Sequence, residues 1–217
     1  KFRIDFNGQR NLRLAEESKF TFKMPRYAEL LLDSYLVINL PNIWSPIYPP
    51  QTSTDEWMPY EFKWIKNLGA LMIKKVTISV GGATLQEYTG EYLYNLVERD
   101  FSESKKKMFY EMTGNISGLN SPGNTGARVN QYPNSFYNTT ANGSEPSIRG
   151  RKLYVPISPW FAHSSKMAFP MVSMQYNELF IEVTLRPIKE LFLIRNVPDE
   201  TYVQPNFNED LHQMYRF

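Results

Sequence analysis

Cysteine is absent from this sequence, and histidine occurs only twice among its 217 residues. Without cysteine, the chain forms no disulfide bonds, no thiolate zinc sites and no cysteine nucleophiles. The two histidines, His163 and His212, cannot supply a three-histidine zinc site. We therefore expect neither a metal site nor a cofactor in this chain.

An excess of charge of one sign is also lacking, because 24 Lys and Arg residues balance 22 Asp and Glu residues. The formal net charge of +2 creates no global field that would attract nucleic acid, so we expect no direct nucleic-acid contact. The one dense basic run, Lys105 to Lys107, is typical of a solvated helix face rather than a phosphate site. No apolar run approaches the roughly 20 residues of a membrane-spanning helix.

Combinations of residues that would indicate catalysis are few. His163 precedes two serines, but adjacent residues on an extended segment point away from each other, so a capping or packing role is favoured. The segment from Gly123 to Arg128 lacks the Lys-Ser/Thr of a phosphate-binding loop. The acidic pairs lie in polar loop sequence, where carboxylates are normally solvated: Glu16-Glu17, Asp55-Glu56 and Asp199-Glu200. These observations predict that the chain is not an enzyme.

What the sequence does contain is a repeated alternation of apolar and polar residues. Leu153, Val155 and Ile157 occupy every second position, and this period of two is typical of a β-strand with one buried face. The same alternation recurs in the stretches 20–24, 36–40, 76–80 and 179–185. With 42% hydrophobic and 15% aromatic residues, the chain is predicted to be globular and mainly β.

Glycine marks one tight turn between two of these strands. Gly81 and Gly82 separate the strand that ends at Val80 from a short strand predicted from Ala83 to Gln86. A two-residue hairpin turn requires positive φ angles, which glycine adopts without steric cost. We therefore predict a β-hairpin with Gly81 and Gly82 at its turn.

Helical spacing and a long polar stretch follow the hairpin. Leu93, Leu96 and Val97 predict one or two short helices, broken near Ser102. The stretch 113–150 is then dominated by Gly, Asn, Ser, Thr and Pro, which predicts a long exposed loop insertion. Its aromatic residues either form a stacking surface for bases or pin the loop to the body, and we favour the second interpretation for Tyr132, Phe136 and Tyr137.

Three glycosylation sequons lie in the same loop. Asn115, Asn138 and Asn142 are each followed two positions later by Ser or Thr. Such short motifs also arise by chance in loops rich in asparagine, so glycosylation at these sites and an unmodified loop are both open interpretations.

A connector rich in Pro, Met and aromatic residues joins the strands at 153–157 and 179–185. The sequence "SPWFAHSSKMAFPM" is too apolar for a free loop, and Pro159 and Pro170 exclude a long helix. We therefore expect this connector to pack against another surface.

Two ordered blocks of sequence together resemble a known family. They are "GALMIKKVTISVGGATLQEYTGEYL" at 69–93 and "RKLYVPISPWFAHSSKMAFPMVSMQYNELFIEVTL" at 151–185, which includes Gln-Tyr-x-Glu at 175–178. They resemble the major capsid proteins of the nucleocytoplasmic large DNA viruses and cover about a third of the chain. The intervening loop matches in position but not in sequence.

The resemblance implies a fold and an assembly. Residues 1–217 would form the N-terminal jelly roll of a double jelly-roll capsid protein, a sandwich of two facing four-stranded sheets with Greek-key connections. It implies a structural protein of the virion, assembled in the host cytoplasm into homotrimers. These trimers are pseudo-hexagonal capsomers that tile an icosahedral shell and contact neighbouring capsomers and minor capsid proteins. The loop 113–150 would then be an outward tower, open to host surfaces.

The resemblance also implies that the connector is buried partly against its own sandwich and partly at a jelly-roll or subunit contact. Aromatic residues and Met are enriched at protein interfaces, so we predict a jelly-roll or subunit interface formed by Trp160, Phe161, Met167, Phe169 and Met171.

The C-terminal part of the sequence departs from the family pattern. After the strand ending at Leu185, only Glu190 to Arg195 is strand-like, and the further strands and the second jelly roll of the family do not follow. The chain is either part of a longer protein or a shortened relative. The first residue is Lys1 rather than Met, which favours a part of a longer polypeptide.

Two other classes of function remain open. A glycan- or receptor-binding β-sandwich on a virion surface would use exposed aromatic residues, for which Trp57, Tyr132 and Tyr137 are the candidates. A hydrolase on a jelly-roll scaffold is disfavoured, because the sequence offers no plausible triad, metal set or paired acid.

Overall fold

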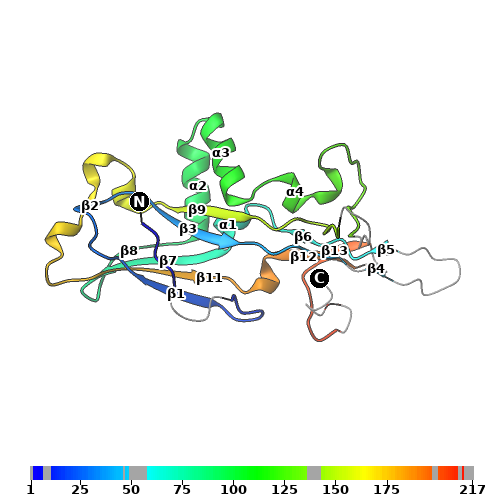
Figure 1. The fold of residues 1–217 in the computed structure, drawn as a ribbon, viewed down its shortest axis with the longest axis horizontal. Coiled ribbons are helices and arrows are strands. Elements are labelled where there is room, and N and C mark those ends of the chain that lie inside the picture. The colour runs from blue at the N-terminus through cyan, green and yellow to red at the C-terminus, as the bar shows by residue number, and fades with distance from the viewer. Residues whose placement is uncertain are drawn as a thin grey trace, which may run out of the picture.

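The alternating segments of the sequence form one large antiparallel sheet (Figure 1). The computed structural model describes residues 2–6, 11–45, 47–48, 58–135, 143–196, 200–209 and 212. The large sheet has the order β1-β11-β7-β8, with the bounds Ser18–Lys23 for β1, Leu179–Leu185 for β11, Ile73–Val80 for β7 and Ala83–Tyr88 for β8. The strand from near the C-terminus therefore lies between two strands from the N-terminal half.

The large sheet has one apolar face and one charged face. Val76, Ile78, Ile181 and Val183 are buried on the inner face, as the period of two predicts. The outer face carries cross-strand ion pairs, including Lys19–Glu182 at 2.8 Å and Lys75–Glu87 at 3.2 Å, and the adjacent pair Lys23–Glu178. An antiparallel sheet with this pattern packs one face on the core and exposes the other to water.

The layer opposite the large sheet is built from shorter pieces. Its main element is the antiparallel pair of β3 (Ser34–Asn39) and β9 (Lys152–Ile157). Beyond the end of the large sheet lie a three-stranded group with the order β13-β12-β6 and the short pair β4–β5 (Figure 1), and the remaining short pair is β10–β2. The bounds are β2 Leu30–Leu31, β4 Ile47–Tyr48, β5 Met58–Pro59, β6 Lys63–Trp64, β10 Phe169–Pro170, β12 Phe192–Asn196 and β13 Thr201–Val203.

The second layer thus differs from the four-stranded sheet that the resemblance implied. The two main strands of this layer are short: β3 ends two residues before Pro41 and β9 ends two residues before Pro159. Proline is itself present within β9, where Pro156 pairs with Tyr35. The inward residues of both layers nevertheless belong to one hydrophobic cluster.

The hairpin between β7 and β8 has the predicted turn. Val80 pairs with Ala83, and the two residues between them, Gly81 and Gly82, have φ angles of +55° and +87°. Both angles lie in the left-handed region, where glycine is favoured. Strand β8 extends to Tyr88, two residues beyond the predicted end at Gln86.

Helices cover one side of the sandwich near β9 (Figure 1). Helices α2 and α3 are separated at Phe101 and Ser102, both with extended backbone, which confirms the predicted break. Lys106 pairs with Glu98 at 3.1 Å and Glu103 at 3.3 Å, as expected for a basic run on a helix surface. The bounds are α1 Leu68–Leu71, α2 Gly90–Asp100, α3 Glu103–Thr113 and α4 Ser117–Asn120.

The length of the helices determines whether any of them could cross a membrane. Within the described ranges, no helix combines the length and the apolar character needed to cross a bilayer.

The long loop 113–150 is more closely attached to the body than the sequence predicted. It contains α4 and a 3-10 turn at Pro122–Asn124, and Leu119 and Tyr132 are buried. Ile148 forms an isolated bridge with Ile43. The loop is therefore not exposed throughout, because apolar residues spaced along it reach the core.

Candidate functional site

The connector between β9 and β11 packs largely into the core of its own chain. Three of the five predicted interface residues are buried, with exposed fractions of 0% for Phe161, 7% for Phe169 and 4% for Met171. The ring centroids of Phe161 and Phe169 lie 5.5 Å apart, and those of Trp160 and Phe161 lie 5.1 Å apart. These three side chains therefore fill the sandwich and are not accessible to a partner.

Only two of the predicted interface residues reach the surface. Met167 is 49% exposed and Trp160 is half-buried. The backbone N–H of Trp160 donates a hydrogen bond to Oε1 of Gln86 at 3.1 Å, which fixes the connector to β8. The interface hypothesis thus remains a prediction for Trp160 and Met167.

Tyr132 anchors the long loop to the body. Its hydroxyl is hydrogen-bonded to Oγ of Ser45 at 2.6 Å and donates to the carbonyl oxygen of Phe62 at 3.0 Å. Its side chain is buried, and this burial raises the pKa of Tyr132 to about 12. The structure confirms that this residue pins the loop, and it contradicts the alternative in which Tyr132 is an exposed stacking surface for sugars.

We expect the substitution Tyr132→Phe to lower the free energy of unfolding by about 1–2 kcal/mol at pH 7, because Ser45 and Phe62 lose a buried hydrogen-bond partner. The loss should shrink as pH rises from about 10 to 12. In that window an unfolded tyrosine ionises while the folded one stays neutral, which destabilises the wild type but not the variant. Urea unfolding at pH 7, 9 and 11 measures this difference, and a loss that stays constant with pH would contradict it.

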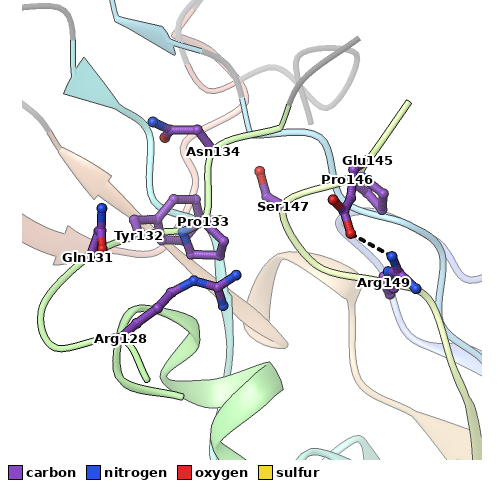
Figure 2. Close-up of a pocket in the computed structure, with 9 residues that line it drawn as sticks. All are labelled: Arg128, Gln131, Tyr132, Pro133, Asn134, Glu145, Pro146, Ser147 and Arg149. Atoms are coloured by element: carbon purple, nitrogen blue, oxygen red, sulfur yellow. Dashed lines mark hydrogen bonds and ion pairs between the residues drawn. The ribbon is translucent and has the colours of Figure 1, made fainter. Parts of the chain in front are cut away.

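A cavity lies between the two limbs of the long loop (Figure 2). Its volume is about 430 Å³, and the guanidinium of Arg149 pairs with Glu145 at 2.5 Å on one wall. Among the described residues that line it, the only carboxylate is thus already neutralised, and no histidine is present. The lining residues are Arg128, Gln131, Tyr132, Pro133, Asn134, Glu145, Pro146, Ser147 and Arg149. This set offers no acid–base pair for catalysis.

The two histidines have structural surroundings. Nδ1 of the buried His212 accepts a hydrogen bond from the backbone N–H of Asn206 at 3.1 Å. Beside the exposed His163, the Ser164 side chain accepts from the N–H of Lys166 at 3.3 Å and caps the following 3-10 turn, the predicted kind of role. In the part of the chain that the structure describes, no three His, Asp or Glu side chains gather to hold a metal.

Of the three asparagines predicted as glycosylation sites, the structure describes only Asn115. Oδ1 of Asn115 accepts hydrogen bonds from the backbone N–H of Asn67 at 3.2 Å and from Nδ2 of Asn120 at 3.1 Å. Its side chain therefore already has a local structural role. The other sequons, Asn138 and Asn142, lie outside the described residues, as do the aromatic candidates Trp57, Phe136 and Tyr137.

Sequence reasoning missed the outer face of the β3–β9 pair. Tyr35, Val37 and Tyr154 are exposed there, although all three are large and apolar in character. A signal was available, because the stretch 35–38 is apolar at both phases of the strand period. Such a strand has two apolar faces, of which only one can face the core of this chain.

Comparison with known proteins gives a consistent set of similarities. A family model described as "Major capsid protein N-terminus" matches residues 2–209. The major capsid protein of Frog virus 3 (isolate Goorha) is 27% identical over 182 residues, covering 82% of this chain and 34% of that protein. The major capsid protein of Phaeocystis pouchetii virus is 25% identical over 191 residues, covering 85% and 34%. The chain spans about a third of the length of these relatives.

Solved structures are similar in fold. The Faustovirus major capsid protein superposes with a TM-score of 0.58 at 14% identity, covering 90% of this chain and 46% of that one. A chain of the PBCV-1 virus capsid superposes with a TM-score of 0.53 at 13% identity, covering 86% and 37%. At these identities the likeness concerns the fold alone.

Proposed function

This chain belongs to the family of major capsid protein N-terminal regions, and from that premise we propose that it builds the shell of a large DNA virus as a structural subunit. The observation that carries the proposal is the family match, which extends over almost the whole chain, residues 2–209. The family membership confirms the resemblance found in the sequence. The fold is the mainly β jelly-roll sandwich of viral capsid proteins, with short helices and long loops.

The arrangement of side chains supports a structural rather than a catalytic role. The buried residues of the sandwich are almost all apolar, and the charges of the large sheet are paired on its outer face. The described residues that line the cavity between the loop limbs include a single carboxylate, that of Glu145, and it is paired with Arg149. Stable packing and a solvated surface are what a shell subunit requires, whereas an enzyme requires converging titratable groups.

The assembly that we propose is a homotrimer. Two jelly rolls in each of three subunits would give a pseudo-hexagonal capsomer, and capsomers would tile an icosahedral shell with minor capsid proteins between them. Met167 and Trp160 are the residues of the connector that can contribute to a contact within this assembly. The protein would reside in the virion after assembly in the host cytoplasm, with the tip of the loop 113–150 directed outward.

The mass of the full-length protein tests this proposal. We expect light scattering during gel filtration to give three times the subunit mass, and negative-stain images of the peak to show hexagonal outlines. A monomer at micromolar concentration would contradict the capsomer proposal.

A matched pair of variants locates the contact. Met167→Glu should lower the trimer yield, because a charge would be buried at a subunit contact. Val129→Glu, at a residue that is 80% exposed on the long loop, should leave the yield unchanged. Equal trimer yields from the two variants would remove the connector from the contact.

A further inference from the structure

The two outer faces of the sandwich differ in chemistry. On the large sheet, charged residues of neighbouring strands pair with each other, as in Lys19–Glu182 and Lys75–Glu87. On the β3–β9 pair, the outward residues are instead Tyr35, Val37 and Tyr154, with exposed fractions of 49%, 50% and 43%. The first face is suited to water, and the second leaves apolar surface unburied.

Two more exposed apolar residues precede β3 in the chain. Leu30 is 55% exposed and Leu32 is 38% exposed, just ahead of Tyr35. Val37 pairs directly with Tyr154 on β9, which widens the surface across two strands. We call the set Tyr35, Val37 and Tyr154 on the outward face of the β3–β9 pair the apolar strip. None of its members lines the cavity between the loop limbs.

Two charges of opposite sign stand at opposite ends of this strip. Asp33 directly precedes β3, whose first residue Ser34 pairs with Ile157. Lys152 is at the other end, paired with Asn39, about 20 Å away at the rise of an extended strand. Both side chains are exposed, and neither forms an ion pair or hydrogen bond with another described residue. They differ in this from the paired charges of the large sheet.

We propose that the apolar strip packs against the same strip of a second copy of this chain, related by a two-fold axis. The antiparallel arrangement places Asp33 of each copy opposite Lys152 of the other. The contact therefore contains two identical ion pairs, and each copy supplies one acidic and one basic partner. A lipid surface would favour cations around an apolar surface, whereas this strip has one charge of each sign. The outward faces of the two β3–β9 pairs would stack as sheets do in a sandwich.

This inference rests on the proposed function and adds a second type of contact to it. A trimer uses head-to-tail contacts between different surfaces, whereas a two-fold contact joins the same surface on both copies. The strip would therefore link one trimer to the next. Shell formation needs contacts between trimers, because closed trimers alone do not extend into a lattice.

Charge reversal at the two ends of the strip tests the two-fold arrangement. Asp33→Lys and Lys152→Asp should each weaken association of trimers about tenfold or more, because each places like charges opposite each other twice in the contact. The double variant, which carries both changes in one chain, should recover association close to that of the wild type. Sedimentation velocity of the full-length protein over a range of concentrations measures the fraction that sediments faster than the trimer.

A control variant, together with a check that the wild-type trimer forms, distinguishes failure of the strip contact from failure of the proposed function. Lys75→Glu reverses a charge on the outer face of the large sheet and should leave association beyond the trimer unchanged. Trimers that form but associate equally well in all variants would overturn the strip contact and leave the capsomer proposal intact. Single variants that weaken association without recovery in the double variant would overturn the two-fold arrangement. If no trimer forms in the wild type, the proposed function itself fails.

Discussion

Replacing Gly90 by alanine is expected to destabilise the protein by about 3 kcal/mol or more, since overpacking against rigid atoms is at the costly end of such changes. Gly90 is the first residue of α2, and a Cβ atom there would lie 2.0 Å from the carbonyl oxygen of Ala70 and 2.4 Å from that of Ile73. Both atoms belong to the backbone, so neither can rotate away. Helix α2 would have to move off α1 and the start of β7.

Urea unfolding of the full-length protein, followed by tryptophan fluorescence, measures this loss as a lower transition midpoint. Gly118→Ala is the matched control, because Gly118 also lies in a helix but its Cβ would meet nothing closer than 3.9 Å. Alanine is the better helix former, so this variant should be as stable as the wild type or slightly more so. A Gly90→Ala protein with the wild-type midpoint would contradict the close approach seen here.

The substitution Phe161→Ala is expected to cost about 3–5 kcal/mol of folding stability, the usual range for removing a large buried aromatic side chain. Phe161 is completely buried, and its ring contacts those of Trp160 and Phe169. The truncation leaves a cavity at the point where the connector meets the core. We expect a low yield of folded protein and a lower urea midpoint.

Met167→Ala separates stability from assembly at the same connector. Met167 is 49% exposed, so this variant should change the free energy of unfolding by less than about 0.5 kcal/mol, measured by urea unfolding. If Phe161→Ala proved as stable as Met167→Ala, the connector would not be packed in the core as described.

Local patterns predicted much of the fold. The strict alternation in Leu153, Val155 and Ile157 gave a strand with those three side chains buried, and the glycine pair gave the hairpin turn. Both signals are local, because strand period and turn geometry depend on neighbouring residues alone. The sequence likewise predicts the break between α2 and α3 near Ser102.

Features that depend on contacts between distant segments were less accessible. The sequence predicts that the connector lies partly against its own sandwich and partly at an interface, but it does not say that Phe161 and Phe169 belong to the core part. Composition cannot separate these cases, because cores and interfaces are enriched in the same residue types. The role of Tyr132 was anticipated, but its partners Ser45 and Phe62 are 87 and 70 positions away in the sequence. Only the folded chain brings them together.

The position of β11 between β1 and β7 constrains the order in which a ribosome-bound chain can fold. The β7–β8 hairpin needs only neighbouring residues and can close as soon as it emerges. Strand β1 has no partner until β11 has been made, because it pairs only with that strand in the large sheet. About 100 residues separate β7 from β11, which corresponds to roughly ten seconds of synthesis. During that interval the apolar face of β1 is not yet covered, because the sheet to which β1 belongs has not formed. The nascent chain therefore exposes a surface that chaperones can bind before it has a folded surface that another subunit can bind.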